Sequence, residues 1–211
     1  KLATSYVEAM LALVDNKSVL IKDSIFGEFA IYFASYLDYQ LSAGKKAIVI
    51  AADRSRIDDI ISVLRKNFKT INDINPVWRI VSADDFQDGK DADVLVCCDK
   101  VLDPIEENEF FRNARCIVVD DPDSNYASGT IMKRIIHSRL SSVVLESKIQ
   151  YIYMCDESNR NLEESIEHTI GQPVAAYQNT LIDKRMCVIV WKGEPYTRMQ
   201  ERLNLRGAYM G

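Results

Sequence analysis

Residues 92–140 read ADVLVCCDKVLDPIEENEFFRNARCIVVDDPDSNYASGTIMKRIIHSRL, and this stretch decides the fold. It contains two short apolar runs, Val94–Cys98 and Cys116–Val119, both rich in β-branched residues. Near-continuous apolar runs of this length are typical of strands buried on both faces of a parallel sheet. The sequence therefore predicts an α/β fold with a mainly parallel sheet.

Acidic residues end both runs: Asp99 ends the first, and Asp120 and Asp121 end the second. In open α/β sheets the loops at the carboxyl ends of the strands form the ligand crevice. We therefore expect these three residues, the rim acids, at the functional edge of the sheet. The alternative is that they only cap turns and the N-termini of helices.

Further elements are predicted on both sides of this stretch. The sheet should also contain the strands Ala47–Ala52, Val77–Val81 and Gln150–Cys155, and Ser18–Ile21 is a short additional strand. The predicted helices are Leu2–Val14, Ile25–Ser42, the segment after Asp53, Asn159–Ile170 ended by Gly171, and Tyr196–Leu205. Cys187–Trp191 is a candidate edge strand, and residues 174–181 receive no assignment.

The motif order resembles the second RecA-like domain of DEAD-box and related superfamily 2 RNA helicases. The resemblance is carried by VLVCCD at Val94–Asp99, LD at Leu102–Asp103, IVVDDP at Ile117–Pro122 and KRIIHSRL at Lys133–Leu140. The family has V-L-V-A-T-D, G-L-D, V-I-N-Y-D-x-P and H-R-I-G-R-x-G-R in this order. The resemblance covers Ser18–Ile170 and implies a RecA-like, doubly wound sheet with helices on both faces.

The residues that carry helicase chemistry are missing from these motifs. His137 and Leu140 stand where the family places its two finger arginines, and such an arginine supplies about 10³–10⁵ in rate. Asp23–Ala30 has one glycine and no G-x-x-x-x-G-K-[ST] pattern, so no phosphate cradle is expected. Residues 82–90 are too short for the family's Q-x-x-R helix. We expect the isolated domain to be no enzyme and to need no cofactor.

Basic residues provide the candidate RNA contacts. The resemblance implies that Arg54 and Arg56, directly after a predicted strand, contact RNA phosphates. With four more residues they form the candidate RNA rim: Arg54, Arg56, Lys100, Lys133, Arg134 and Arg139. A secondary basic stripe consists of Arg198, Arg202 and Arg206, spaced four apart. The alternative is that these are solvated faces paired with acids.

Composition excludes several classes. The 211 residues carry a net charge of −5 and are 47% hydrophobic, which argues against bulk electrostatic capture of nucleic acid but permits a sizeable core. No run of about 18 apolar residues occurs, so no membrane insertion is expected. The five cysteines form no CxxC pair, which predicts no metal site and suits a reducing, cytoplasmic compartment.

We expect an excised piece of a longer protein, with an N-terminal helix or linker (1–17), the RecA-like domain (18–170) and a C-terminal extension packed on it (171–211). The predicted function is a catalytically inactive module that binds single-stranded RNA or acts as a scaffold. The decayed motif set resembles that of the Yb-like Tudor-domain helicase-related proteins, which implies piRNA biogenesis and perinuclear RNA granules. The alternatives are a protein–protein or self-association domain, and half of an active ATP-dependent RNA helicase.

Overall fold

The computed structural model describes residues 4–22, 26–71, 78–86, 92–98, 110, 113–120, 149–155 and 162–178. The chain divides into two units, residues 1–179 and 180–211, and every described residue belongs to the first unit. Among the described helices, none is long and apolar enough to cross a membrane. The predicted strand at 187–191 and the predicted helix at 196–205 lie outside the described residues.

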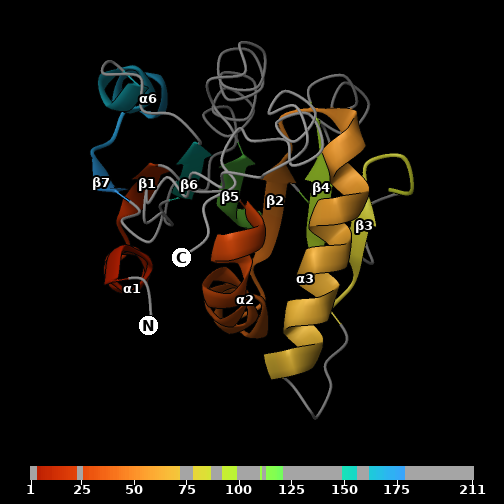
Figure 1. The fold of residues 1–211 in the computed structure, drawn as a ribbon. Helices are drawn as coiled ribbons and strands as arrows, with labels where there is room; N and C mark the ends of the chain where they lie inside the picture. The colour runs from red at the N-terminus through yellow and green to blue at the C-terminus, as the bar shows by residue number, and fades with distance from the viewer. Residues whose placement is uncertain are drawn as a thin grey trace, which may run out of the picture. The chain divides into compact units, whose positions relative to one another are not determined.

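The core of this unit is a parallel sheet with the strand order β3-β4-β2-β5-β6-β1-β7 (Figure 1). Every neighbouring pair of strands in it runs parallel. The predicted parallel α/β fold is therefore confirmed. The strands are β1 (Ser18–Lys22), β2 (Lys46–Ile50), β3 (Ile80–Ser82), β4 (Val94–Cys97), β5 (Ala114–Asp120), β6 (Gln150–Cys155) and β7 (Val174–Gln178).

Two strands enlarge the five-stranded sheet that the apolar runs predict. The short predicted strand at the start of the chain is β1, which lies between β6 and β7. Residues 174–178, which received no assignment, form the edge strand β7. Only Val174 of β7 is buried, so this strand lacks the apolar run that marks the inner strands. The predicted strands β3 and β4 also form and pair with each other, although β3 begins at Ile80, three residues after its predicted start at Val77.

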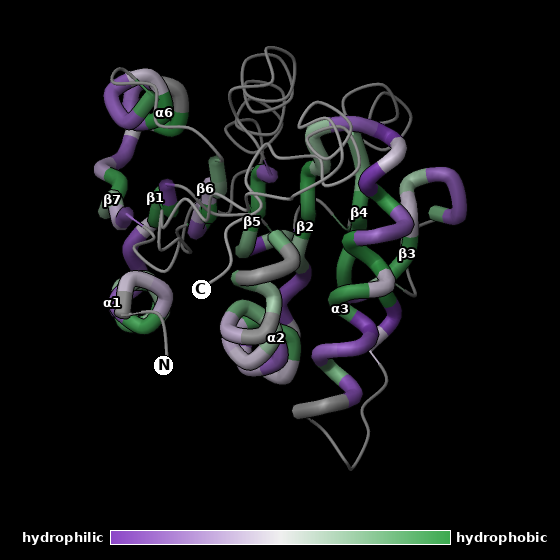
Figure 2. Tube along the Cα trace, in the orientation of Figure 1, coloured by the Kyte–Doolittle hydropathy of each residue, from purple (hydrophilic) through white to green (hydrophobic). Residues whose placement is uncertain are grey.

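Helices cover both faces of the sheet, as predicted. The helices are α1 (Thr4–Val14), α2 (Phe26–Ser42), α3 (Ile57–Ile71) and α6 (Leu162–Ile170), with a 3₁₀ turn, η1 (Arg54–Arg56), before α3. One core cluster joins α1, α2 and α3 to residues such as Val49, Val96 and Val118. The other joins α6 to alternate strand residues such as Ile48 and Leu95. Figure 2 shows the hydrophobic strands beside α3, whose hydrophilic and hydrophobic residues alternate along the helix.

Helix α2 is deeply buried, as the closely spaced apolar residues along it predict. Its side chains Phe26, Phe29, Phe33, Leu37 and Leu41 are all buried. Phe29 and Phe33, one helical turn apart, stack with ring centroids 5.8 Å apart. The apolar residues at this spacing hold α2 against the sheet and fix the entry into β2.

Glycine ends α6 at the predicted position. Gly171 has a φ of 66°, a left-handed conformation that side chains rarely adopt, and its N–H donates to the carbonyl of Glu167 at 2.9 Å. The chain can then turn back at once into β7, where the backbone N–H of Val174 donates to Glu167 Oε1 at 2.8 Å. The loop between α6 and the sheet edge is thus held by both backbone and side chain.

A buried hydrogen-bond network ties α1 and α2 to the amino end of β6. The hydroxyl of Tyr36 donates to Gln150 Oε1, and Gln40 Nε2 donates to the same oxygen at 3.3 Å. Gln150 Nε2 in turn donates to the carbonyl of Leu13 at 2.6 Å. Burial raises the pKa of Tyr36, so its hydroxyl remains a donor at neutral pH. The network joins two helices near the start of the chain to a strand that begins 114 residues after Tyr36.

We predict that Tyr36→Phe lowers the free energy of unfolding by about 1 kcal/mol, because one buried hydrogen bond is lost while Gln40 still satisfies Gln150. Urea unfolding followed by circular dichroism measures this change. Tyr39→Phe is the matched control, since Tyr39 lies on the same helix with 69% of its surface exposed. Equal stabilities for the two variants would contradict the role of the network.

Candidate nucleic-acid interface

The candidate interface is the edge of the sheet at which the parallel strands end. Strand β2 lies between β4 and β5, so the loop after β2 can reach residues on both sides. The loop is fixed to the sheet where it begins, because the N–H of Ala51 donates to the carbonyl of Cys97 at 2.8 Å. Loops in this position form the ligand crevice of open α/β sheets.

Asp53 shapes this loop into the 3₁₀ turn η1. Its Oδ1 accepts hydrogen bonds from the backbone N–H of Ser55 at 2.8 Å and from the Ser55 hydroxyl at 2.5 Å. These bonds stabilise the ionised carboxylate and lower the pKa of Asp53. Asp53 is the N-cap of η1, and its capping contacts fix the backbone from which Arg54 and Arg56 project.

Arg56 pairs with a buried carboxylate on the neighbouring strand. Its Nη2 lies 3.0 Å from Oδ2 of Asp120, the last residue of β5. The side chain of Asp120 is 3% exposed and that of Arg56 is 36% exposed. Asp120 therefore lies at the predicted edge of the sheet, but it faces the β2 loop from a buried position instead of standing open to solvent.

Arg54 reaches in the opposite direction, past the end of β4. Its Nη2 lies 2.5 Å from Oδ2 of Asp84, which follows β3. Both side chains of this pair are exposed, 71% for Arg54 and 49% for Asp84. The two arginines of the β2 loop thus reach to opposite sides of β2, Arg56 toward β5 and Arg54 past β4.

A tight turn after β3 positions Asp84. The hydroxyl of Ser82 donates to Asp85 Oδ2 at 2.8 Å, and the N–H of Asp85 donates back to that hydroxyl oxygen at 3.2 Å. The N–H of Ala83 continues the sheet pairing by donating to the carbonyl of Val96 at 3.0 Å. Because Asp85 is engaged with Ser82, Asp84 is the acid of this turn that pairs with Arg54.

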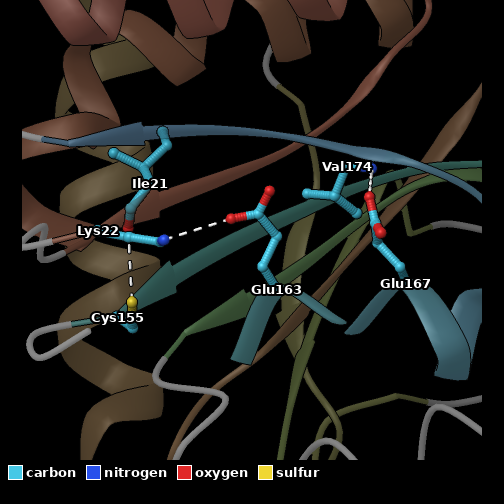
Figure 3. Close-up of polar contacts among 6 residues, drawn as sticks. All are labelled: Ile21, Lys22, Cys155, Glu163, Glu167 and Val174. Carbon is cyan, nitrogen blue, oxygen red and sulfur yellow. Dashed lines mark hydrogen bonds and ion pairs between the residues drawn. The ribbon is translucent and has the colours of Figure 1, made fainter. Parts of the chain in front are cut away.

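A third basic residue at the strand ends is also paired with an acid. Figure 3 shows Lys22, the last residue of β1, with its Nζ 3.3 Å from Glu163 Oε2 of α6. Beside it, Cys155 Sγ contacts the carbonyl oxygen of Ile21 at 3.9 Å. Lys22 was not among the sequence candidates, although its place at the end of a strand could have indicated it. Its ion pair fastens α6 to the sheet.

The predicted site residues are described only in part. Arg54, Arg56 and Asp120 lie at the same edge of the sheet, whereas Asp84, which pairs with Arg54, was missed by the sequence analysis. The other candidates, Lys100, Lys133, Arg134, Arg139, Asp99, Asp121, Arg198, Arg202 and Arg206, lie outside the described residues.

The described cysteines are buried thiols. Cys97, Cys98, Cys116 and Cys155 are all buried. Burial raises the pKa of Cys116 to about 12 and also raises that of Cys97, which keeps both thiols protonated and unreactive at neutral pH. Within the described part of the chain, no group of three or more His, Cys, Asp or Glu residues is arranged to hold a metal ion. The described chemistry of the edge is therefore that of paired charges.

Comparison with known proteins identifies the fold. No protein-family model matches this sequence, and no curated protein matches it. Among solved structures, DUF1998 helicase MrfA bound to DNA is similar with a TM-score of 0.67 and 12% identity, covering 83% of this chain and 25% of that one. MrfA in another crystal structure gives a TM-score of 0.67 over 100% of this chain and 40% of that one.

A hypothetical ATP-dependent RNA helicase from Sulfolobus tokodaii is also similar, with a TM-score of 0.61 and 11% identity, over 86% of this chain and 54% of that one. This chain thus spans between a quarter and about half the length of these helicases. At such low identities the likeness shows the fold alone. It is a RecA-like α/β fold, which confirms the predicted fold class.

We predict that Arg56→Gln lowers the free energy of unfolding by about 2 kcal/mol, because it removes the arginine that pairs with the buried Asp120 carboxylate. This figure is below the usual cost for a fully buried pair, since Arg56 is partly solvated. Arg54→Gln is the matched control from the same loop and should change stability by less than about 0.5 kcal/mol. Urea unfolding measures all variants.

The double variant Arg56→Gln with Asp120→Asn removes both the buried carboxylate charge and the arginine that pairs with it. It should be more stable than Arg56→Gln alone, which gives a positive coupling energy in a double-mutant cycle. Additive effects of the two substitutions would contradict a direct interaction between these side chains.

Proposed function

We propose that this chain is a non-catalytic RecA-like module, derived from a helicase C-terminal domain, that binds single-stranded RNA within a larger RNA-processing protein. The observation that carries the proposal is the placement of Arg54 and Arg56 together at the carboxyl edge of a helicase-like sheet. Phosphate contacts by such residues supply affinity that does not depend on RNA sequence.

The absence of catalysis follows from the motif residues. ATP hydrolysis needs positive charge directed at the transferred phosphate, and the sequence has His137 and Leu140 at the two finger positions. Neutral histidine is a weak substitute near pH 7, and leucine carries no charge. By analogy with the Yb-like Tudor-domain proteins, we propose that the module acts in the cytoplasm, in perinuclear granules of the piRNA pathway.

A second candidate function is protein–protein binding or self-association without RNA. It is favoured by the ion pairs, since Arg54, Arg56 and Lys22 are each matched by an acid and the whole chain has a net charge of −5. The third candidate, half of an active helicase, requires a catalytic partner domain and would appear as ATPase activity of the full-length protein.

We predict that ATP with magnesium produces no binding heat with this chain in isothermal titration calorimetry. The physical reason is that residues 23–30 lack the glycines and the lysine that would cradle phosphates. Micromolar binding of ATP would contradict the non-catalytic assignment.

We predict weak, salt-sensitive binding of a single-stranded oligouridine, measured by gel shift at two salt concentrations. Each phosphate contact that is lost should reduce the slope of log affinity against log salt by about 0.7. Reversal of Arg54 and Lys133 to glutamate should abolish binding.

The matched control reverses Lys17 and Lys69, which makes the same change in net charge. Both are exposed, and they lie before β1 and in the last turn of α3, on the amino side of the sheet. This variant should retain most of the RNA binding. Absence of binding by the unaltered chain at low salt would favour the protein-binding candidate instead.

A further inference from the structure

The two arginines of the β2 loop are held by carboxylates of very different accessibility. The Arg54–Asp84 pair is exposed on both sides, whereas Arg56 pairs with an Asp120 side chain that is only 3% exposed. The two arginines are separated by one residue and project from the same 3₁₀ turn. The two ion pairs therefore differ in the environment of the carboxylate, and not in the arginine itself.

Exposure decides how readily each pair can be exchanged. Solvent and salt screen an exposed ion pair, so the net free energy that holds Arg54 on Asp84 is small. A phosphate group offers the same guanidinium an equivalent charged acceptor. Exchange of Asp84 for a phosphate leaves Asp84 in water, where an ionised carboxylate is well solvated.

The same exchange is unfavourable for Arg56. Moving its guanidinium to a phosphate would break an ion pair whose carboxylate is only 3% exposed, where little solvent can compensate for the loss. Arg56 therefore remains on Asp120 when an anion arrives. Of the two sequence candidates in this loop, Arg54 is thus the one whose ion pair exchanges more readily.

We propose that Asp84 competes with RNA phosphate for Arg54, so that Arg54 is the exchangeable phosphate contact of the loop and Arg56 is its fixed anchor. This inference rests on the proposed RNA-binding function and names the residue that limits its affinity. Asp84 acts as an internal substitute for phosphate, and it lowers RNA affinity without contacting RNA.

Substitution of Asp84 by asparagine tests the competition directly. Asp84→Asn should strengthen binding of a fluorescein-labelled 12-residue oligouridine, measured by anisotropy, by up to about fivefold. Asp85→Asn is the matched control, since it removes the same charge from the neighbouring residue, whose contact is with Ser82. It should change affinity much less than Asp84→Asn does.

Two further variants identify which arginine is released by Asp84→Asn. In Arg54→Gln the gain from Asp84→Asn should disappear, because the competition has lost its target. In the double variant Arg56→Gln with Asp120→Asn, which removes both charges of the buried pair, the gain should persist. Equal gains from Asp84→Asn and Asp85→Asn, or a gain that survives Arg54→Gln, would overturn the inference.

Inorganic tripolyphosphate separates this inference from the proposed function. Calorimetric titration with tripolyphosphate should show the same gain for Asp84→Asn, whether or not RNA binds. A gain with tripolyphosphate but no RNA binding by any variant would support the competition and contradict the RNA function. Failure of both probes to bind Asp84→Asn would overturn the inference, because a released Arg54 must accept a polyanion.

Discussion

The ion pair between Arg56 and the buried Asp120 organises the carboxyl edge of this sheet. It joins the loop after β2 to the end of β5, at the centre of the strand order, where two strand ends meet. A buried carboxylate needs a charge partner, and the loop supplies it at a position set by the Asp53 cap. The conformation of the loop is thereby fixed, and Arg54 is left to face the other side of β2.

This arrangement changes how the basic residues of the edge are interpreted. Arginine that follows a strand of such a sheet suggests an open phosphate contact. Here, however, each guanidinium group is already paired with a carboxylate: Arg56 with Asp120 of β5, and Arg54 with Asp84 of the turn after β3. Among the residues described at this edge, four aspartates (Asp53, Asp84, Asp85 and Asp120) outnumber the two arginines. In the described part of this edge, affinity for nucleic acid would come from exchange of the weak, exposed Arg54–Asp84 pair, which is why we propose weak and salt-sensitive binding.

The sequence predicted the sheet well, because inner strands such as β2, β4 and β5 are buried on both faces and therefore read as apolar runs. It missed β7, since an edge strand with exposed alternate residues leaves no such run. It placed Arg54, Arg56 and Asp120 at the correct edge, because residues that follow parallel strands share one edge. It could not predict the ion pairs: Arg54 and Asp84 are 30 residues apart, and their contact depends on the spatial order of the strands.

We propose that Arg56 is fixed by a buried partner while Arg54 exchanges its partner. Nuclear magnetic resonance of the arginine guanidinium groups measures this most directly, through the rotation of each group about its Nε–Cζ bond. We expect slow rotation with separate Nη signals for Arg56, and fast, averaged signals for Arg54. Rotation of Arg56 as fast as that of Arg54 would contradict the account.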